Sequence, residues 1–461
     1  MTELMWFRRD LRLTDNPALA RAAAGGEVVG LFVLDPALLR SAGPARLAWL
    51  SASLKALDDS MGGALHVVPG RPSEVVPRLA AAVAAERVNV SADFGPYGRR
   101  RDASVSAALS QTQASLIATG SPYAIAPGRV AKGDGSAYRV FTPFYKAWLG
   151  HGWRPPLAPA PSIQWRRPSD VPGSAGVETV PEPPAAALPC DVGERAAERA
   201  WEAFRQDGLA HYRARRDRPD LGGTSVLSPH LRWGEIHPRT LLADLDDGEG
   251  AEAFRRELAF REFYADILAR NPSSATNSLD PNFDKPDLYR QAVSADADFE
   301  HWCRGTTGYP FVDAGMRQLL AQGWMHNRVR MVVASFLVKD LLIPWWRGAE
   351  WFMHHLADGD LASNSQGWQW VAGCGTDAAP YFRVFNPVTQ GLRFDPHGDY
   401  VRRFVPELRG IEGAAVHEPW TLPSAVPGYP EPIVDHGEAR KEALARFAHL
   451  REAATALTQA D

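Results

Sequence analysis

The stretch from Trp324 to Trp370 carries the side chains with the richest chemistry in this chain. It places six tryptophans among arginines, carboxylates and amides inside a long apolar pattern with helical spacing. Large polar side chains are seldom fully buried without partners. The mixture therefore indicates a buried, flat ligand with polar edges, or redox work. A large helical core with a few satisfied salt bridges is the competing interpretation, and spacing alone favours it.

Two other places carry functional groups at suggestive spacing. Residues 222–225 read as a Gly-Gly-Thr-Ser loop, and Ser228 followed by Pro229 is typical of a helix start. Loop N–H groups, hydroxyls and a helix N-terminus can together hold an anion, although an ordinary capped helix explains the pattern too. Glu257 and Arg261 stand at i and i+4, where a surface ion pair worth at most about 1 kcal/mol is the plain alternative.

Composition bounds the class of protein. A chain of 461 residues with 45% hydrophobic residues is expected to form at least two globular domains. Its three cysteines form no C-x-x-C pair, which argues against a disulfide framework or a metal site. A net charge of −4 does not indicate nucleic-acid binding, but a local basic face would suffice for it. With no membrane-length apolar run and no signal core, we expect a cytoplasmic protein.

The order of elements predicts two domains of different class. Apolar runs at 4–7, 28–34, 65–69 and 87–94 read as buried strands, and helical patterns cover Pro17–Ala24, Pro44–Asp58 and Ser73–Ala85. This alternation predicts a doubly wound parallel α/β sheet over residues 1–130. No glycine-rich dinucleotide or phosphate-loop motif follows any of these strands.

Beyond the sheet, the sequence changes character. Ten prolines between Arg154 and Pro189 predict an extended linker, which we place at residues 131–193. After Glu194 the strand pattern vanishes, and apolar residues at three- and four-residue spacing follow, as in Ala251–Arg270 and Asp313–Ile343. We therefore expect residues 194–461 to be all-α.

Several motifs together resemble the photolyase/cryptochrome family. They are WFRRDLRLTDN at the start and the segments at residues 212–239, 256–268, 307–319, 324–331, 358–370 and 375–391. The resemblance runs to about Glu442 and is strongest to class I cyclobutane pyrimidine dimer photolyases. It implies an antenna domain, a helical FAD domain and light-driven repair of the dimer by an electron from excited, reduced anionic FAD. A blue-light cryptochrome without repair, or a (6-4) photolyase, remains the alternative.

The resemblance implies a set of FAD contacts. Residues 224–228 would grip the FAD diphosphate, Arg330 would pair with Asp358, and Asn364 would face flavin N5, where an amide suits a reduced flavin. The full implied set is Tyr212, Thr224, Ser225, Val226, Leu227, Ser228, Phe254, Glu257, Arg261, Asn327, Arg330, Asp358, Asp360 and Asn364.

It also implies a lesion pocket and a DNA face. Phe260 stands where the family has a tryptophan that stacks on the damaged bases, and Asn327 stands where (6-4) enzymes have a histidine used as an acid–base group. His326 beside it is expected to be structural. The residues expected to contact UV-damaged DNA are Arg216, Glu257, Phe260, Asn327, Arg328, Met331, Trp370, Arg383 and Gln390.

Trp368 and Trp345 match the first two members of the family's electron-transfer chain. The third position falls near Ala292, which is no tryptophan, and Trp346 or Trp302 could supply another exit. With these two tryptophans, the expected catalytic set is completed by Glu257, Asn327, Met331 and Asn364.

The first domain often holds an antenna pigment in this family. Residues 93–102 lack the glutamate of folate-binding members and look more like deazaflavin-binding relatives, with Arg9, Asp10 and Asp93 as expected contacts. Asn364 and the short tail disfavour a cryptochrome, whereas Phe260 and the missing third tryptophan keep that alternative open. We expect a monomer.

Overall fold

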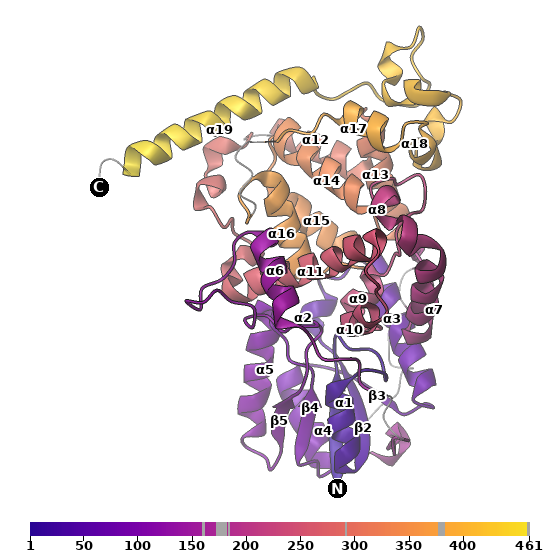
Figure 1. The fold of residues 1–461 in the computed structure, drawn as a ribbon, viewed down its shortest axis with the longest axis vertical. Helices are drawn as coiled ribbons and strands as arrows, with labels where there is room; N and C mark the ends of the chain where they lie inside the picture. Colours follow the sequence, from indigo (N-terminus) through magenta and orange to yellow (C-terminus); the bar gives the residue numbers. More distant parts are fainter. Residues whose placement is uncertain (159–161, 172–181, 183–184, 291–292, 377–382, 459–461) are drawn as a thin grey trace. The chain divides into compact units, whose positions relative to one another are not determined.

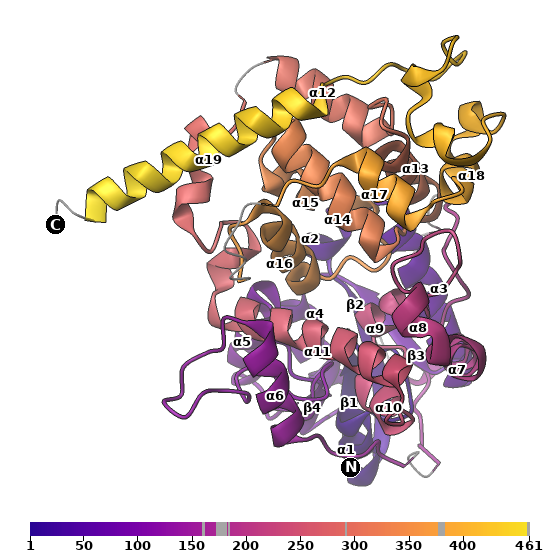
Figure 2. The ribbon, with the colours of Figure 1, turned by 45° about the horizontal axis from the view of Figure 1, so that its top comes forward.

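The computed structural model describes residues 1–158, 162–171, 182, 185–290, 293–376 and 383–458, without the side chains of 293, 294 and 451–458 (Figures 1 and 2). The chain forms two compact units. Unit 1 comprises Met1–Ala210, Ser225–Pro272 and Ala357–Asp360, and unit 2 comprises His211–Thr224, Ser273–Leu356 and Leu361–Asp461. The predicted combination of a parallel sheet and a mostly helical remainder is confirmed.

Unit 1 is built on a five-stranded parallel sheet. The strands are β1 (Thr2–Phe7), β2 (Glu27–Leu34), β3 (Leu65–Pro69), β4 (Arg87–Val90) and β5 (Ser115–Ala118). Their order is β3-β2-β1-β4-β5, so β1 and β4 pair at the point where the winding reverses. Ligands of such sheets bind beyond the carboxyl ends of the strands at this point. The fifth strand was not predicted, because its apolar run is only three residues long and all four of its residues are at least partly exposed.

Alternate side chains of β1 enter separate cores on the two faces of the sheet. Met5 and Phe7 pack with Trp49 and its neighbours, whereas Leu4 and Trp6 pack with Val88 and its neighbours. Helices supply the rest of both layers and of unit 1. They are α1 (Pro17–Gly25), α2 (Pro36–Leu39), α3 (Pro44–Ser60), α4 (Pro72–Ala82), α5 (Pro96–Leu109), α6 (Phe141–His151), α7 (Glu194–Ala203), α9 (Ser228–Trp233), α10 (Pro238–Ala243) and α11 (Glu249–Arg270).

Part of the predicted linker is fixed to the sheet. Trp165 forms an isolated parallel bridge with Val28 at the start of β2, and its ring packs against the core that contains Trp49. An extended, proline-rich segment can make such a bridge because it already has a strand-like backbone. The linker is therefore a surface cover along this stretch rather than a free tether.

The described part of unit 2 consists of helices joined by loops, with no β-strand. The apolar pattern over 313–343 is divided: α13 (Pro310–Gln322) ends at Gly323, which adopts φ 61°, and α14 (Asn327–Ser335) starts after the His326 cap and runs into a π-turn at Phe336–Asp340. The remaining helices are α8 (Tyr212–Arg215), α12 (Val293–Arg304), α15 (Trp345–His355), α16 (Leu361–Ala372), α17 (Pro387–Phe394), α18 (Asp399–Phe404) and α19 (His436–Thr458). None of the described helices is long and apolar enough to cross a membrane.

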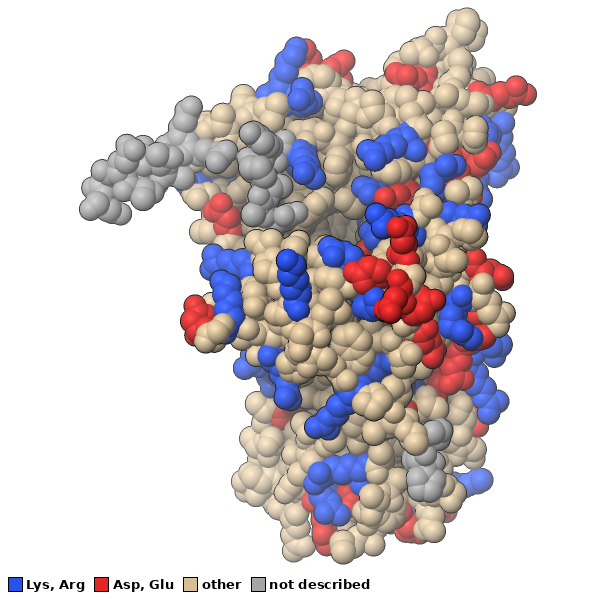
Figure 3. Space-filling model, in the orientation of Figure 1, with Lys and Arg blue, Asp and Glu red and all other residues tan. Residues whose placement is uncertain are grey.

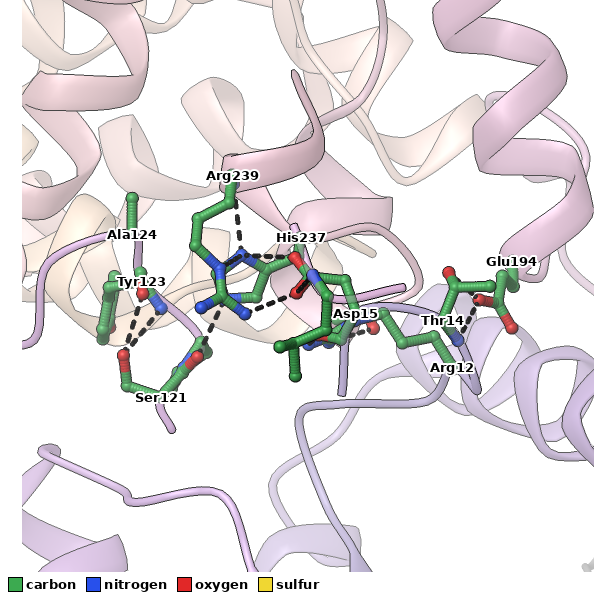
Figure 4. A network of polar contacts seen from close by, with 12 residues as sticks. Arg12, Thr14, Asp15, Ser121, Tyr123, Ala124, Glu194, His237 and Arg239 are labelled. Carbon is green, nitrogen blue, oxygen red and sulfur yellow. Dashed lines mark hydrogen bonds and ion pairs between the residues drawn. The ribbon is translucent and has the colours of Figure 1, made fainter. Parts of the chain in front are cut away.

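A buried ionic network secures the loop between β1 and α1. Asp15 accepts a hydrogen bond from Arg239 at 2.6 Å and lies 3.4 Å from His237 (Figure 4). Arg12 donates to the Asp15 backbone carbonyl at 2.8 Å, and Glu194 of α7 accepts from the Thr14 backbone at 2.8 Å. The network joins α7 and α10 to the loop that leaves the central strand.

Candidate functional site

The helix α11 places one member of the predicted site in a well-defined setting. Arg261 donates to the carbonyl oxygens of Pro122 at 3.0 Å and Leu231 at 3.1 Å, and its guanidinium lies 4.7 Å from the centre of the Tyr123 ring. Glu257 lies one turn earlier on the same face and is half-buried. Arg261 therefore braces unit 1 through backbone carbonyls, in addition to any ligand it meets.

The loop before α9 has an unusual backbone. Val226, a β-branched residue, adopts φ 51°, a region that costs such residues about 1–3 kcal/mol. Leu227 N–H lies 3.4 Å from the Ser225 hydroxyl. The next residue, Ser228, is exposed, yet its hydroxyl donates to the buried Asp358 carboxylate at 2.6 Å. Strain at this point is consistent with a loop shaped for a ligand rather than for its own stability.

Asp358 and Asp360 lie in a short segment that belongs to unit 1, although the helices on either side of it belong to unit 2. Both side chains are buried, and Asp360 forms an ion pair with Arg9. The predicted ion pair between Asp358 and Arg330 joins residues of different units and stays a prediction.

In unit 2, α14 and α16 pack together and carry most of the other predicted residues. On α14, Asn327 is exposed, Arg330 and Met331 are half-buried, and Arg330 donates to the Met325 carbonyl at 2.8 Å. On α16, Asn364 donates its amide N–H to the Ala349 carbonyl at 2.9 Å. This hydrogen bond leaves the Asn364 carbonyl oxygen as an acceptor for another partner.

The tryptophans of unit 2 include two groups of rings in contact among the described residues, one around Trp345 and one around Trp368. Trp368 and Trp345 are 3% and 0% exposed, and Trp345 donates to the Ser278 hydroxyl at 2.9 Å. Trp345 lies 6.1 Å from half-buried Trp346, and Trp346 lies 5.4 Å from Tyr289. On another side, Trp368 lies 6.1 Å from buried Trp302. Both suggested substitutes therefore contact a predicted member, whereas Ala292 lies outside the described residues.

A glycine makes room for the first tryptophan. A Cβ at Gly348 in α15 would come within 2.2 Å of the Trp368 ring, so only glycine allows this approach of α15 to α16. The position of Trp368 is thus fixed by backbone packing as well as by its own contacts.

Two of the predicted aromatic contacts have protein partners. The Phe260 ring stacks on Phe141 of α6 with centroids 3.4 Å apart, so one of its faces is covered. Phe254 is 5% exposed and packs against Trp201 and Phe204 at 5.2 and 5.5 Å, as a core residue does. A ligand could reach only the other face or the edge of the Phe260 ring.

The predicted DNA contacts of unit 2 differ in how they are held. Arg328 donates to Asp217 at 2.9 Å and lies over the Phe394 ring at 4.5 Å. Arg216 lies 5.8 Å from the centre of the Tyr212 ring, and Tyr212 is buried. Arg383 is exposed, whereas Trp370 on α16 and Gln390 on α17 are half-buried. Figure 3 shows Lys and Arg side chains spread over the face drawn, with acidic side chains gathered beside them.

The predicted antenna residues lie beyond the carboxyl ends of β1 and β4, where the winding reverses. Asp10 accepts from the Arg8 backbone at 2.7 Å, and Asp93 accepts from Arg101 at 3.1 Å. Burial alone would raise the pKa of Asp93, but Arg9, Arg101 and Arg8 lower it below its ordinary value. Each of the three predicted contacts, including Arg9, therefore already has a protein partner.

Comparison with known proteins decides the family. Residues 3–162 match the family model "DNA photolyase", and residues 254–449 match "FAD binding domain of DNA photolyase". A deoxyribodipyrimidine photo-lyase of Halobacterium salinarum is 40% identical over 97% of this chain and 99% of its own. The chain belongs to the DNA photolyase family.

Solved structures of this family share the whole fold. A bacterial class III photolyase from Agrobacterium tumefaciens is 37% identical with a TM-score of 0.91, covering 98% of each chain. A Synechocystis cryptochrome is 28% identical with a TM-score of 0.87, covering 96% of this chain and 98% of its own. The family prediction is confirmed, and FAD is the cofactor of the matched photolyase domain.

Features of unit 1 fit the FAD that this photolyase domain binds. Arg9 Nε and Arg232 Nη1 are buried N–H groups with no hydrogen-bond partner among the described residues. Both arginines lie beside the segment that contains Asp358 and Asp360. Unsatisfied cationic donors next to a strained loop suit an anionic ligand. Arg232 was missed by sequence reasoning, because nothing in the spacing of SPHLRW marks its arginine. No group of His, Cys, Asp and Glu in the described chain could hold a metal ion.

His326 has the structural role expected of it in this photolyase. It is 4% exposed and caps α14 by accepting a hydrogen bond from the Arg328 backbone at 3.2 Å. Burial is the main cause that lowers its pKa from 6.5 to about 4; Arg330 and Arg328 lower it further, and Asp217 opposes them.

Acidification should therefore weaken the folded state through His326. Between pH 6.5 and about 4, His326 is protonated in the unfolded chain but stays neutral in the folded chain. Because the unfolded chain then binds more protons, the free energy of unfolding falls as pH falls. His326→Asn keeps a capping side chain and removes this loss, up to about 3 kcal/mol. Urea titrations at several pH values would measure it, with exposed His397→Asn as control. If the free energy of unfolding of His326→Asn depends on pH as steeply as that of the parent, His326 is not the source of the acid sensitivity.

Proposed function

We propose that the chain repairs cyclobutane pyrimidine dimers in UV-damaged DNA, driven by blue light. The single observation that carries this choice is the first turn of α14. It presents exposed Asn327 and half-buried Met331, whereas the neighbouring His326 is buried as the helix cap. A (6-4) photolyase needs a histidine as an acid–base group in its pocket. The one histidine in this turn is engaged elsewhere and resists protonation, which supports the dimer as substrate.

The bound cofactor would supply the electron. The chemistry that FAD would supply when bound in its reduced anionic state is light-driven, reversible donation of one electron. The protein's part is to bind, orient and exclude water. Glu257 would hydrogen-bond a base edge in the lesion, and Asn364 would offer its side-chain carbonyl oxygen to a flavin N–H while its amide N–H donates to Ala349.

We assign the rest of the FAD site by the same resemblance. Residues 224–228 would hold the diphosphate, supported by the strained backbone at Val226. Arg261, Arg330, Asp358, Asp360 and Tyr212 would line the flavin and its ribityl chain. Phe254 would contribute only through the core it packs in, because its ring is covered by Trp201 and Phe204.

DNA would be held by arginines around the lesion pocket. Arg216, Arg328 and Arg383 can donate to phosphates, which gives affinity without sequence preference. Arg328 would have to share its guanidinium between Asp217 and a phosphate. Exposed Arg383 carries no such competing ion pair in the described residues, and Trp370 and Gln390 would border the same surface.

The proposal is tested by product analysis. The chemically reduced protein is illuminated with one oligonucleotide that carries a cyclobutane dimer and another that carries a (6-4) lesion, with dark samples as controls. Thymine absorbance should recover only for the dimer. Recovery only for the (6-4) lesion would overturn the choice of substrate, and recovery for neither would favour the cryptochrome alternative.

Phe260 should set the affinity for the lesion. Phe260→Trp should tighten binding of dimer-containing DNA and Phe260→Ala should weaken it, because base–aromatic stacking is worth about 1–3 kcal/mol per base. This corresponds to roughly tenfold to a hundredfold in Kd. Since Phe141 covers one face of Phe260, only its other face is open to a base. Fluorescence titrations with damaged and undamaged duplexes provide the measurement and its control; equal affinities for all three proteins would remove Phe260 from the pocket.

The remaining parts of the proposal concern organisation. We assign the antenna domain to residues 1–130, a linker to 131–193 and the FAD domain to 194–461, which is supported by the confinement of all five strands to residues 2–118. A deazaflavin is favoured over a folate as antenna pigment, and extraction with mass spectrometry would identify it. We also propose a cytoplasmic monomer, which gel filtration and fractionation would test.

A further inference from the structure

Each residue of the segment Ala357–Asp360 forms a hydrogen bond or an ion pair with another part of unit 1. All four residues are buried. Trp233 Nε1 donates to the Ala357 carbonyl at 3.0 Å, the Ser228 hydroxyl to Asp358 at 2.6 Å, and Arg232 Nε to the Gly359 carbonyl at 2.8 Å; Arg9 forms an ion pair with Asp360. We call these four residues the carboxylate segment.

Three of the four partners just named lie on one short helix. Ser228, Arg232 and Trp233 all belong to α9, so one rigid element sets the position of the first three residues. The fourth partner, Arg9, follows the central strand β1. The carboxylate segment is therefore positioned by α9 and by the loop after β1 together.

The helix and the loop are themselves locked together. Gly234 ends α9 with φ 71°, and a Cβ there would lie 1.9 Å from the Arg9 carbonyl oxygen. Leu11 N–H donates to the Trp233 carbonyl at 3.2 Å, and Arg12 donates to the Gly234 carbonyl at 2.9 Å. Arg9 is thus held by its backbone on the same scaffold that holds the rest of the segment.

Two further arginines, Arg46 and Arg232, add positive charge near the carboxylates of Asp358 and Asp360. Arg46 and Arg232 interact electrostatically with Asp360, and Arg46 also with Asp358. Burial and the neighbouring Arg9 and Arg46 lower the pKa of Arg232 to about 9. Burial would lower the pKa of Arg9 too, but the Tyr123 hydroxyl and Asp360 outweigh it, so the pKa of Arg9 is raised. Arg9 therefore stays charged at all working pH values.

We propose that Arg9 is a positioning residue of the flavin site, which acts through Asp360. It holds this carboxylate in place and offsets its charge, so that the neighbouring Arg46 and Arg232 favour an anionic, reduced flavin. The inference rests on the proposed function, because it takes Asp358 and Asp360 to face the flavin. It gives an arginine of the sheet domain a part in the redox state of the cofactor.

The measurement is the reduction potential of bound FAD. In Arg9→Gln, Asp360 keeps its charge but loses its ion pair with Arg9, so more of its negative charge acts on an anion nearby and disfavours it. The ratio of reduced to oxidised flavin at a given potential should fall about tenfold, which is about 30 mV for a two-electron couple. FAD release on dilution, followed by its fluorescence, should also rise. Arg87→Gln is the matched control: Arg87 forms an ion pair with Glu3 at the amino end of the same sheet.

Two further variants show whether Arg9 acts through Asp360. In an Asp360→Asn background, Arg9→Gln should shift the potential by much less than in the parent, because the carboxylate it neutralises is gone. Arg9→Lys should keep the parental potential at neutral pH and lose it at alkaline pH, since a lysine can deprotonate and an arginine cannot. If Arg9→Gln fails to fold, the shift in the reduction potential of Arg9→Lys at alkaline pH is sufficient by itself to test the role of Arg9.

The outcomes separate this inference from the proposed function. A parent that binds FAD and repairs dimers, with an unshifted potential in Arg9→Gln, overturns the role of Arg9 and leaves the function standing. The role of Arg9 is also overturned if Arg9→Gln shifts the reduction potential equally in the Asp360→Asn background and in the parent. It is overturned as well if Arg9→Lys keeps the parental potential at alkaline pH. A parent that binds no FAD removes the proposed function itself.

Discussion

Trp368→Phe is expected to lose most of its photoreduction of oxidised flavin. Trp368 lies one helical turn after Asn364 on α16, and Gly348 lets α15 approach its ring closely. As the first member of the proposed chain, it would pass an electron toward the flavin and receive one from Trp345. Phenylalanine fills the same space but is much harder to oxidise. Continuous illumination with a reductant, followed by flavin absorbance, gives the rate.

The same variant should still repair dimers after chemical reduction, because repair moves an electron between flavin and DNA without the tryptophans. Trp420→Phe is a control in the same unit, since its ring packs only against Tyr309 in the described ring contacts. Transient absorption would report a tryptophanyl or tyrosyl radical, and Ala292→Trp should lengthen its lifetime by moving the hole outward. Parental photoreduction in Trp368→Phe would exclude this residue from the route.

Asp15→Ala should be among the most destabilising single changes in unit 1. It would leave Arg239 without its carboxylate partner in a buried site, and breaking a buried pair in this way costs about 3–5 kcal/mol. Asp15 also adopts φ 43°, a conformation that aspartate tolerates better than alanine. Urea unfolding followed by circular dichroism would show an earlier transition for the unit.

The exposed Asp59 of α3 offers a control for that change. Asp59→Ala should stay within about 0.5 kcal/mol of the parent, as surface substitutions usually do. Asp15→Asn should lose less than Asp15→Ala, because asparagine keeps the backbone conformation and hydrogen-bonding atoms. An Asp15→Ala transition at the parental urea concentration would show that the network in Figure 4 contributes little.

Local pattern predicted the elements where burial is continuous. The four predicted strands are buried along most of their length on both faces of a parallel sheet, whereas Ser115–Ala118 at the sheet edge is partly exposed and has an apolar run of only three residues. The division of residues 313–343 was missed, although Gly323 could have indicated it as a helix end. Apolar spacing continues through such a break because both helices face the same core.

The site could be predicted as a set of residue types but not as a set of contacts. The spacing of Glu257 and Arg261 left a surface ion pair open as an alternative, and the hydrogen bonds from Arg261 to the carbonyls of Pro122 and Leu231 were not predicted. Arg9 was predicted as an antenna contact, which stays a prediction, and its ion pair with Asp360, 351 positions away, was not predicted. Such hydrogen-bond partners depend on how distant segments of the chain pack together. The local spacing of apolar residues carries no information about that packing.

The carboxylate segment also constrains the order in which the chain can fold. Unit 1 is assembled from three stretches, and its last four residues follow 84 residues of unit 2. During synthesis, α9 and Arg9 emerge long before residues 357–360. Until those residues are made, the donors of α9 and Arg9 lack the acceptors that they have in the folded protein. Closing such a long loop is entropically costly and slow. A nascent or truncated chain that stops at residue 272 would hold the whole sheet yet expose an arginine-lined gap, a natural point for chaperones to bind and for proteases to cut.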